Sequence, residues 1–445
     1  MQIPQGLSLA FLVAVLGACG GSAGPAAPPP PPAAWSEPTP VVTLDVPSSG
    51  YDVSLQAVQP DAAGGLTAKW TQPSGLPGFA HRQASGVWTQ VPSIPATAGS
   101  TYRAWTIGAS GVDSVLIGTG LDVPITLTAI RFAAGAWSAP ASVASSVPMH
   151  GSHADKAIYD TRRRLAYSPL ATADGLLPAV TRYDPAAVGW LPVELLAALP
   201  GTTQVYVGTG AIAADGRMMA TWWTQVNGEV MHVYHTFRPG TGWSEPAVLP
   251  GVDTSSPYRI FAGVDGGFLV SHIRRTTHLD HRLLSRFHPD TGWEPPVVVA
   301  STLAGIVNVQ LYPGAMYQGE AGHILATWEQ PSQPVPGGSV VWEPWSRFFD
   351  PATGWTPPVK APQLTLRSGE VGNAVRVGPS GKVIVASQSG ISTLDGNGNW
   401  VTADPPPNQS NDGSPSFAIE ASGAITAVWR ESANNRISFM SSTYR

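Results

Sequence analysis

The sequence predicts an all-β protein built from repeated four-stranded units, and three observations support this fold class. The chain of 445 residues contains 48 glycines and 44 prolines and only 12% charged residues, which is typical of many short strands joined by turns. A tryptophan-centred phrase recurs along the chain, and apolar residues alternate with a period of two between its copies. Because stacked repeats share one continuous core, this length does not require several domains.

The repeat is clearest in three near-identical phrases that contain Thr-Gly-Trp followed by proline. They span residues 238–246, 288–296 and 350–358. Weaker copies complete a series of tryptophans whose successive members lie 45 to 62 residues apart. A period near fifty residues is typical of a four-stranded propeller blade. The series consists of Trp35, Trp88, Trp137, Trp190, Trp243, Trp293, Trp355 and Trp400, and we expect these side chains to be buried.

A second pattern lies between these phrases, in which an apolar residue, alanine and tryptophan alternate. It is found at residues 218–222 and again in the segments that end at Trp70, Trp328 and Trp429. A period of two places these side chains on one face of a strand. Each segment follows a glycine-containing turn signal, so we expect it to be the second strand of a hairpin.

The two ends of the repeat predict how the ring closes. Residues 35–42 have the pattern of an outermost strand with no blade before them, whereas the last unit stops after a third strand at residues 436–441. Pairing these segments leaves no long exposed sheet edge. The sequence therefore predicts one closed β-propeller over residues 35–445, with eight blades and the N-terminal strand completing the last one. Seven blades are the alternative, because the repeats around Val115 and Ala166 are weak.

The first residues have the features of an export signal. Residues 7–16 form an apolar run that is too short to span a bilayer as a helix but has the length of a signal-peptide core. Cys19 follows at once and is the only cysteine, so an exported form of this chain cannot contain an internal disulfide. We expect residues 1–18 to be a signal peptide, although residues 1–5 lack the usual positive charge.

The segment Leu-Gly-Ala-Cys-Gly at residues 16–20 resembles the lipobox of bacterial lipoproteins. This resemblance implies that Cys19 carries the lipid that anchors the protein to a membrane. Glycine rather than aspartate at position 20 implies the outer membrane of a diderm bacterium. An ordinary signal peptide with an incidental cysteine is the alternative. Residues 19–34 include five consecutive prolines and are expected to form a linker.

The predicted domain resembles the β-propeller repeats of bacterial surface lipoproteins, and its turn phrase is similar to a degenerate Asp-box of sialidase-type propellers. The closest copy is residues 393–400, Thr-Leu-Asp-Gly-Asn-Gly-Asn-Trp. The arginine cluster, tyrosine and glutamate of sialidase chemistry cannot be assigned to positions in this sequence. The lipid anchor and eight-bladed ring are also similar to the outer-membrane assembly lipoprotein that supports barrel insertion. These resemblances imply a fold and no particular activity.

A candidate ligand face follows from propeller topology, since the connections between second and third strands and those between blades emerge on one side. Two such connections carry side chains that could bind a ligand or a divalent metal such as Zn²⁺. Solvated loop histidines are the alternative, so the sequence requires no cofactor. The first connection holds His150, His153 and Asp155. The second holds Arg274, Arg275, His278, Asp280 and His281.

Composition and missing motifs narrow the function. A net charge of −5 and a pI near 6.0 give no basic face for nucleic acid. Phosphate-binding, zinc-protease and nucleophile-elbow motifs are absent from the sequence. We expect a monomeric binding or scaffold module for a protein or glycan, and an extracellular polysaccharide hydrolase or lyase is the alternative. An insertion at residues 330–345 is the expected specificity loop.

Overall fold

The computed structural model describes the chain from residue 34 onward, and residues 35–445 form one compact unit. The predicted signal peptide, Cys19 and most of the linker therefore lie outside the described residues and stay predictions. Among the described residues, no helix is long and apolar enough to cross a membrane. The longest internal gaps in the description are 46–52, 120–125, 150–157, 302–315, 333–340, 362–373 and 404–414.

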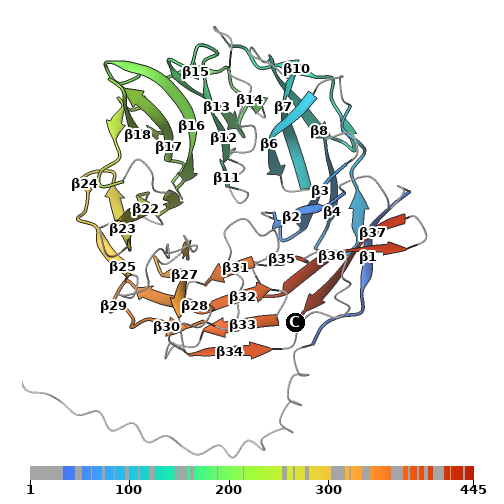
Figure 1. The fold of residues 1–445 in the computed structure, drawn as a ribbon. Coiled ribbons are helices and arrows are strands. Elements are labelled where there is room, and N and C mark those ends of the chain that lie inside the picture. Colours follow the sequence, from blue (N-terminus) through green and yellow to red (C-terminus); the bar gives the residue numbers. More distant parts are fainter. Residues whose placement is uncertain are drawn as a thin grey trace, which may run out of the picture. The chain divides into compact units, whose positions relative to one another are not determined.

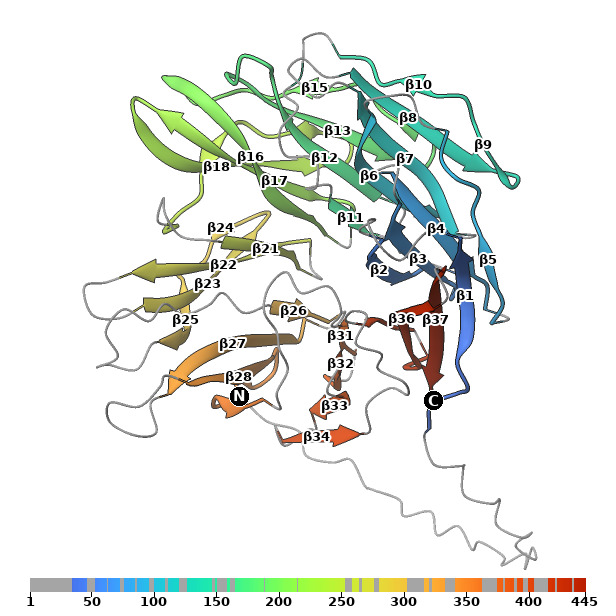
Figure 2. The ribbon, with the colours of Figure 1, turned by 45° about the vertical axis from the view of Figure 1, so that its right-hand side comes forward.

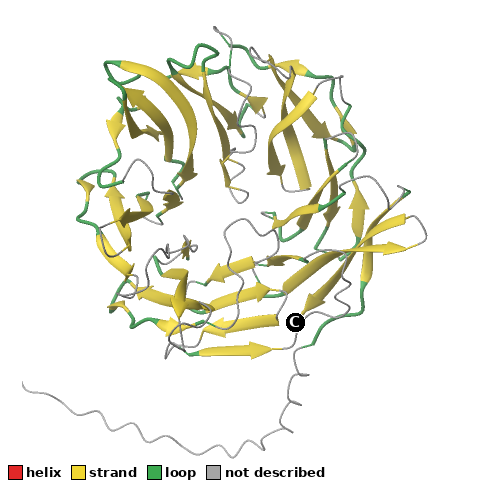
Figure 3. Cartoon of the chain, in the orientation of Figure 1, coloured by secondary structure: helices red, strands yellow, loops and turns green. Residues whose placement is uncertain are grey.

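Residues 35–445 form eight antiparallel sheets that follow one another in chain order around a ring (Figures 1 and 2). Figure 3 shows strands and loops and no helix in the described part of the chain. The eight-bladed, all-β prediction is confirmed, and the alternative of seven blades is wrong. We number the sheets as blades 1 to 8 in chain order, with a to d for the strand positions from first to last.

The strands of blades 1 to 4 have the following bounds. Blade 1 comprises β2 (Leu55–Pro60), β3 (Leu66–Thr71), β4 (Pro77–Arg82) and β5 (Trp88–Gln90). Blade 2 comprises β6 (Ser100–Gly108), β7 (Gly111–Thr119), β8 (Thr126–Ala133), β9 (Ala136–Trp137) and β10 (Ala141–Ser142). Blade 3 comprises β11 (Ile158–Asp160), β12 (Leu165–Ala171), β13 (Pro178–Asp184), β14 (Gly189–Trp190) and β15 (Glu194–Leu195). Blade 4 comprises β16 (Thr202–Ile212), β17 (Met218–Val226), β18 (Glu229–Arg238), β19 (Gly242–Trp243) and β20 (Ala247–Val248).

Blades 5 to 8 continue the series. Blade 5 comprises β21 (Tyr258–Ala262), β22 (Phe268–Arg275), β23 (Asp280–His288), β24 (Gly292–Trp293) and β25 (Val297–Ser301). Blade 6 comprises β26 (Met316–Gln318), β27 (Ile324–Ser332), β28 (Val341–Asp350), β29 (Gly354–Trp355) and β30 (Val359–Lys360). Blade 7 comprises β31 (Ala374–Val377), β32 (Val383–Ser387), β33 (Gly390–Leu394) and β34 (Trp400–Ala403). Blade 8 comprises β35 (Ser416–Ile419), β36 (Ile425–Ala433), β37 (Arg436–Tyr444) and β1 (Thr39–Leu44).

The ring closes through the N-terminal strand, as the sequence predicts. Strand β1 pairs antiparallel with β37 from Thr39 opposite Ser441 to Leu44 opposite Ile437. Trp35 forms a further bridge to Tyr444, and their rings lie 5.4 Å apart. The last blade is therefore assembled from both ends of the domain, and β37 is paired on both sides.

The outermost strand is shorter and more broken than the sequence suggests. In blade 5 we expect one strand from Trp293 to Val299, but β24 and β25 are separated by Glu294, Pro295 and Pro296. Proline has no N–H to donate to a strand ladder and is confined to edge positions in sheets. The same interruption occurs in blades 2 to 6, so the prolines of the phrase shorten the exposed edge of each of these blades.

The hydrophobic core is divided among the eight junctions between neighbouring blades. Eight clusters of buried residues each combine side chains of two adjacent blades. The alternating pattern supplies the deepest members, and Trp70, Trp222, Trp328 and Trp429 are at most 3% exposed. The tryptophans of the turn phrase are different, because Trp243 and Trp293 are only half-buried. The expectation that the phrase tryptophans are buried is wrong for all of them except Trp190, which is 9% exposed, since the outermost strand has a neighbour on one side only.

Candidate functional site

The predicted ligand face is described only in part. His150, His153, Asp155 and His278 lie outside the described residues, as do the side chains of Arg275 and Asp280. Arg274 is exposed at the end of β22, and Nδ1 of His281 lies 2.8 Å from Oγ of Ser301. Within the described part of the chain, no three histidine, cysteine or acidic side chains converge on a point that could hold a metal ion. The metal hypothesis stays a prediction.

The predicted specificity insertion lengthens a hairpin of blade 6. Strand β27 continues to Ser332 and β28 begins at Val341, and the two remain paired to their ends. Residues 333–340 lie outside the described part. Trp345, one of the aromatic residues of this segment, packs against the buried cluster between blades 5 and 6. The described portion of the insertion is therefore an extended pair of strands.

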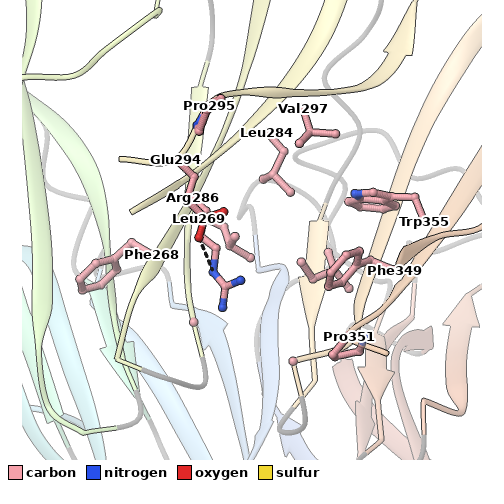
Figure 4. A pocket seen from close by; sticks show the side chains of 13 residues that line it. Phe268, Leu269, Leu284, Arg286, Glu294, Pro295, Val297, Phe349, Pro351 and Trp355 are labelled. Carbon is pink, nitrogen blue, oxygen red and sulfur yellow. Dashed lines mark ion pairs between the residues drawn. The ribbon is translucent and has the colours of Figure 1, made fainter. Parts of the chain in front are cut away.

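A pocket of about 270 Å³ opens between blades 5 and 6 on the opposite side of the ring (Figure 4). We call it the junction pocket. The turns that join strands a to b and strands c to d surround its mouth, since Gly263, Gly322 and Pro351 lie in those turns. Its other lining residues are Phe268, Leu269, Leu284, Arg286, Glu294, Pro295 and Val297 of blade 5 and Ile324, Phe349 and Trp355 of blade 6.

The floor of the junction pocket is apolar and partly aromatic. Leu269, Leu284 and Ile324 are buried members of the cluster between the two blades. Phe349 and Trp355 pack on this cluster from the blade 6 side, with ring centroids 5.3 Å apart. An aromatic surface at the edge of a core offers an apolar ligand face a stacking partner without further rearrangement.

Two charged side chains of blade 5 reach the same pocket. Arg286 comes from strand β23 and Glu294 follows Trp293 directly, and Figure 4 shows the two side chains directed toward each other. The guanidinium Nε of Arg286 lies 4.0 Å from the carboxylate of Glu294, and the side chains are 41% and 50% exposed. An ion pair this long and this exposed contributes little to stability. The Glu294 carboxylate can therefore exchange it for a hydrogen bond to a ligand.

Glu294 replaces a residue that has a structural role elsewhere in the repeat. In four other blades a serine or threonine follows the phrase tryptophan, and its hydroxyl accepts the backbone N–H of the strand opposite it. These hydroxyls belong to Ser36, Ser138, Ser244 and Thr356, at N···O distances of 3.0 to 3.1 Å. The backbone of Glu294 keeps its place in the ladder through the bond from its N–H to the Arg286 carbonyl at 2.8 Å. The backbone hydrogen bonding of the repeat is therefore retained, and the Glu294 side chain lies in the pocket.

Leu284 lies at a position that varies between blades, and blades 1, 2, 3 and 7 also lack a hydroxyl group there. Three residues before the aromatic end of strand c, blades 4, 6 and 8 have Tyr234, Ser346 and Ser441. Each of these hydroxyls accepts the indole N–H of the next blade's phrase tryptophan at 2.9 to 3.0 Å. Leu284 has no hydroxyl, and the Trp355 indole has no hydrogen bond to any described residue. Figure 4 shows the indole nitrogen on the side of the ring that faces Leu284, where a ligand can accept from it.

Neighbouring junctions show how the equivalent space is filled. Between blades 4 and 5 the ring of Tyr234 lies 5.6 Å from Trp293 and 5.9 Å from Phe287. Between blades 3 and 4 the guanidinium of Arg182, which corresponds to Arg286, lies 4.2 Å from the ring centre of Phe237. Glu194 holds that guanidinium through bonds of 3.0 and 2.6 Å. The junction pocket is open because neither filling device is present there.

A separate cluster of titratable residues is buried on the opposite side of blade 5. Tyr258 bonds to the Thr221 hydroxyl at 2.7 Å, and its burial raises its pKa to about 12. The rings of His232 and Tyr258 lie 4.6 Å apart. His272 is 1% exposed, and burial, together with the charge of Arg274, lowers its pKa to about 4. These groups pack the junction between blades 4 and 5, where Tyr258 and His272 are neutral near pH 7.

The pocket residues could have been found in the sequence as departures from the repeat. Serine or threonine follows the tryptophan in the phrases at Trp243 and Trp355, whereas glutamate follows Trp293. The sequence gives no such signal for Leu284, because the residues of strand c differ too much from blade to blade for a departure to be recognised.

Comparison with known proteins gives distant structural neighbours only. No family model and no curated protein matches the chain. A prolyl endopeptidase structure has a TM-score of 0.47 and 12% identity over 85% of this chain, and a puromycin hydrolase has 0.45 and 14% over 88%. This chain covers 54% and 60% of those two proteins. An ulvan lyase has a TM-score of 0.40 and 11% identity over 89% of this chain and 95% of its own. These neighbours are β-propeller proteins.

Proposed function

We propose that this protein is an exported binding protein that holds one residue of a glycan in the junction pocket. One observation carries the proposal. Side chains fill the equivalent space at the neighbouring junctions. Here blade 5 instead presents the Arg286 guanidinium and the Glu294 carboxylate beside the aromatic pair Phe349 and Trp355.

The chemistry of the pocket suits a sugar ring. A pyranose has an apolar C–H face that packs on an aromatic ring and a rim of hydroxyls that both donate and accept. Guanidinium and indole groups donate, and a carboxylate accepts, so Arg286, Trp355 and Glu294 can satisfy hydroxyls of both kinds. A volume of about 270 Å³ is below the roughly 300–1,000 Å³ of sites for drug-sized ligands, which favours a single ring.

The cellular location is part of the proposal. A signal peptide at residues 1–18 and a lipid on Cys19 would place the propeller at the outer membrane, where glycans of the cell envelope or of the surroundings are accessible. Metabolic labelling with a radioactive fatty acid tests the anchor. Loss of the label in Cys19→Ser would support it, and an unlabelled wild-type protein would contradict it.

The experiment for the pocket uses the full chain carrying Cys19→Ser, screened on a glycan array and then by calorimetry with the best ligand. The decisive variant is Leu284→Tyr, which gives blade 5 the residue that closes the junction between blades 4 and 5. We expect it to weaken binding at least tenfold, because the new ring occupies the pocket and takes the Trp355 indole N–H. Glu294→Gln should weaken binding by a similar factor, since hydrogen bonds to charged groups are worth about 1.5–3 kcal/mol.

Arg238→Ala is the matched control. Arg238 is exposed, pairs with Asp290 at 3.3 Å and does not line the pocket. Its replacement should leave the dissociation constant unchanged. A glycan that binds Leu284→Tyr as tightly as the parent chain would show that the pocket is not the site, and an array without any bound glycan would favour a protein ligand.

A polysaccharide hydrolase or lyase is the second candidate, and the junction pocket does not favour it. Hydrolysis by the usual mechanisms needs two carboxyl groups about 5–10 Å apart. Glu294 is the single carboxylate among the described residues that line the pocket, and these include no histidine, lysine or tyrosine to act as a base. Release of reducing ends or unsaturated products from the bound glycan, lost in Glu294→Gln, would support the enzyme instead.

A further inference from the structure

A second pocket occupies the equivalent place between blades 7 and 8. It has a volume of about 540 Å³ and opens among the same turns of its two blades. The strand registers relate the two pockets, since Ile384 opposite Thr393 matches Leu269 opposite Arg286, and Tyr444 matches Phe349. The open junction is therefore a recurring feature of this ring, with different side chains at each place.

Basic side chains dominate the rim of this second pocket, which we call the basic pocket. Lys382 and Arg445 are exposed and line it, and neither side chain has an ion-pair partner among the described residues. At the position of Lys382, directly before strand b, blade 4 has Arg217 and blade 6 has His323. These lie near carboxylates of Asp215 at 3.1 Å and Asp350 at 3.6 Å. Among the described residues, Lys382 differs from these two counterparts in having no ion-pair partner. The residue of blade 7 that corresponds to Asp350 is Asp395, which lies outside the described residues.

The acidic side chain of the basic pocket is already engaged. Arg82 of blade 1 forms an ion pair with Glu420, and the hydroxyl of Thr426 donates to the same carboxylate oxygen at 3.1 Å. The guanidinium of Arg376 also donates to the backbone carbonyl of Glu420. Among the described residues, the basic side chains in and around the pocket outnumber the acidic ones, since Lys382, Arg445, Arg82 and Arg376 accompany the single carboxylate of Glu420. The local field favours an anion.

We propose that the basic pocket is a second ligand site and that it takes an acidic sugar, whose carboxylate pairs with Lys382 and Arg445. The Thr393 hydroxyl can bond to a ring hydroxyl, and the ring of Tyr444 can pack on the sugar face. The proposal rests on the glycan-binding function proposed above. It adds a charge preference that the junction pocket, with its paired Arg286 and Glu294, does not have.

The test compares an oligogalacturonate with a neutral oligosaccharide that binds the junction pocket. Both are measured by calorimetry on the full chain carrying Cys19→Ser. We expect Lys382→Ala to weaken oligogalacturonate binding at least fivefold and to leave neutral binding unchanged. The oligogalacturonate affinity should also fall as salt is raised from 50 to 300 mM, because an exposed ion pair is screened.

Leu284→Tyr separates this inference from the function on which it rests. Loss of neutral binding with retained oligogalacturonate binding would support two distinct sites. Oligogalacturonate binding that is insensitive to both Lys382→Ala and Lys382→Glu would overturn the second site while leaving the junction pocket intact. If inorganic sulfate competes as strongly as the oligosaccharide, the assignment to a sugar is wrong.

Discussion

Two neighbouring junctions share the same backbone framework but differ in their surfaces. The junction between blades 4 and 5 is filled, and the junction between blades 5 and 6 is open. In the first, Tyr234 fills the space beside Trp293 and accepts its indole N–H at 3.0 Å. In the second, Leu284 leaves that space open beside Trp355. The difference teaches that the repeat separates positions that hold the ring together from positions that can vary, and that a pocket arises where the variable ones depart from the pattern.

The largest expected effect concerns the core beneath the open junction. If this junction is as well packed as its neighbours below the surface, Trp328→Ala should lower the free energy of unfolding by about 3–5 kcal/mol, since Trp328 is 2% exposed. Trp355→Ala should cost less, because its side chain is half-buried. Urea denaturation of both variants checks this order. Equal losses would show that the pocket wall is as important to stability as the core.

A smaller effect is expected from the closed junction at low pH. The pKa of His272 is about 4 in the folded protein and near 6.5 in the unfolded chain, so the unfolded state binds more protons between these values. The free energy of unfolding should therefore fall by roughly 3 kcal/mol as the pH drops from about 6.5 to about 4. Denaturation at several pH values, compared with His272→Gln, measures this. An unchanged pH slope in the variant would show that His272 does not titrate as its burial implies.

The smallest effect is expected from opening the closed junction. Tyr234→Leu copies the residue of the open junction into blade 4 and removes a hydrogen bond and an aromatic contact, which together are worth about 1–3 kcal/mol. Thermal denaturation should show a modest loss of stability, and Leu284→Tyr should show a gain or no change. A loss of stability in both variants would mean that each junction is fitted to its own residue and that the comparison between them fails.

The fold could be predicted largely from the sequence because its signals are local and repeated. The apolar alternation at residues 218–222 predicts which face of a strand is buried, and the phrase around Trp243 predicts a turn. The spacing between the phrase tryptophans predicts the length of a blade. The unpaired pattern at residues 35–42 was enough to predict the closure that β1 and β37 make. Interruption of the outermost strand was missed, although prolines 295 and 296 signal it.

The candidate site could not be predicted in the same way. Arg286, Glu294 and Trp355 lie on three separate segments of two blades, and nothing local in the sequence shows that they line one space. The histidine-rich connections that the sequence favours do not line this pocket, and His150 and His153 lie outside the described residues. Comparing each blade with the repeat would have identified Glu294 alone.

The sequence by itself determined the all-β repeat and the strand that closes the ring, because each depends on hydrogen bonding and burial within units of about fifty residues. The tertiary structure alone decided which junctions are open. That outcome depends on whether the side chains of one blade fill the space left by the next, as Tyr234 does and Leu284 does not. Packing between neighbours is a property of two surfaces, and the pattern within one repeat carries no record of it.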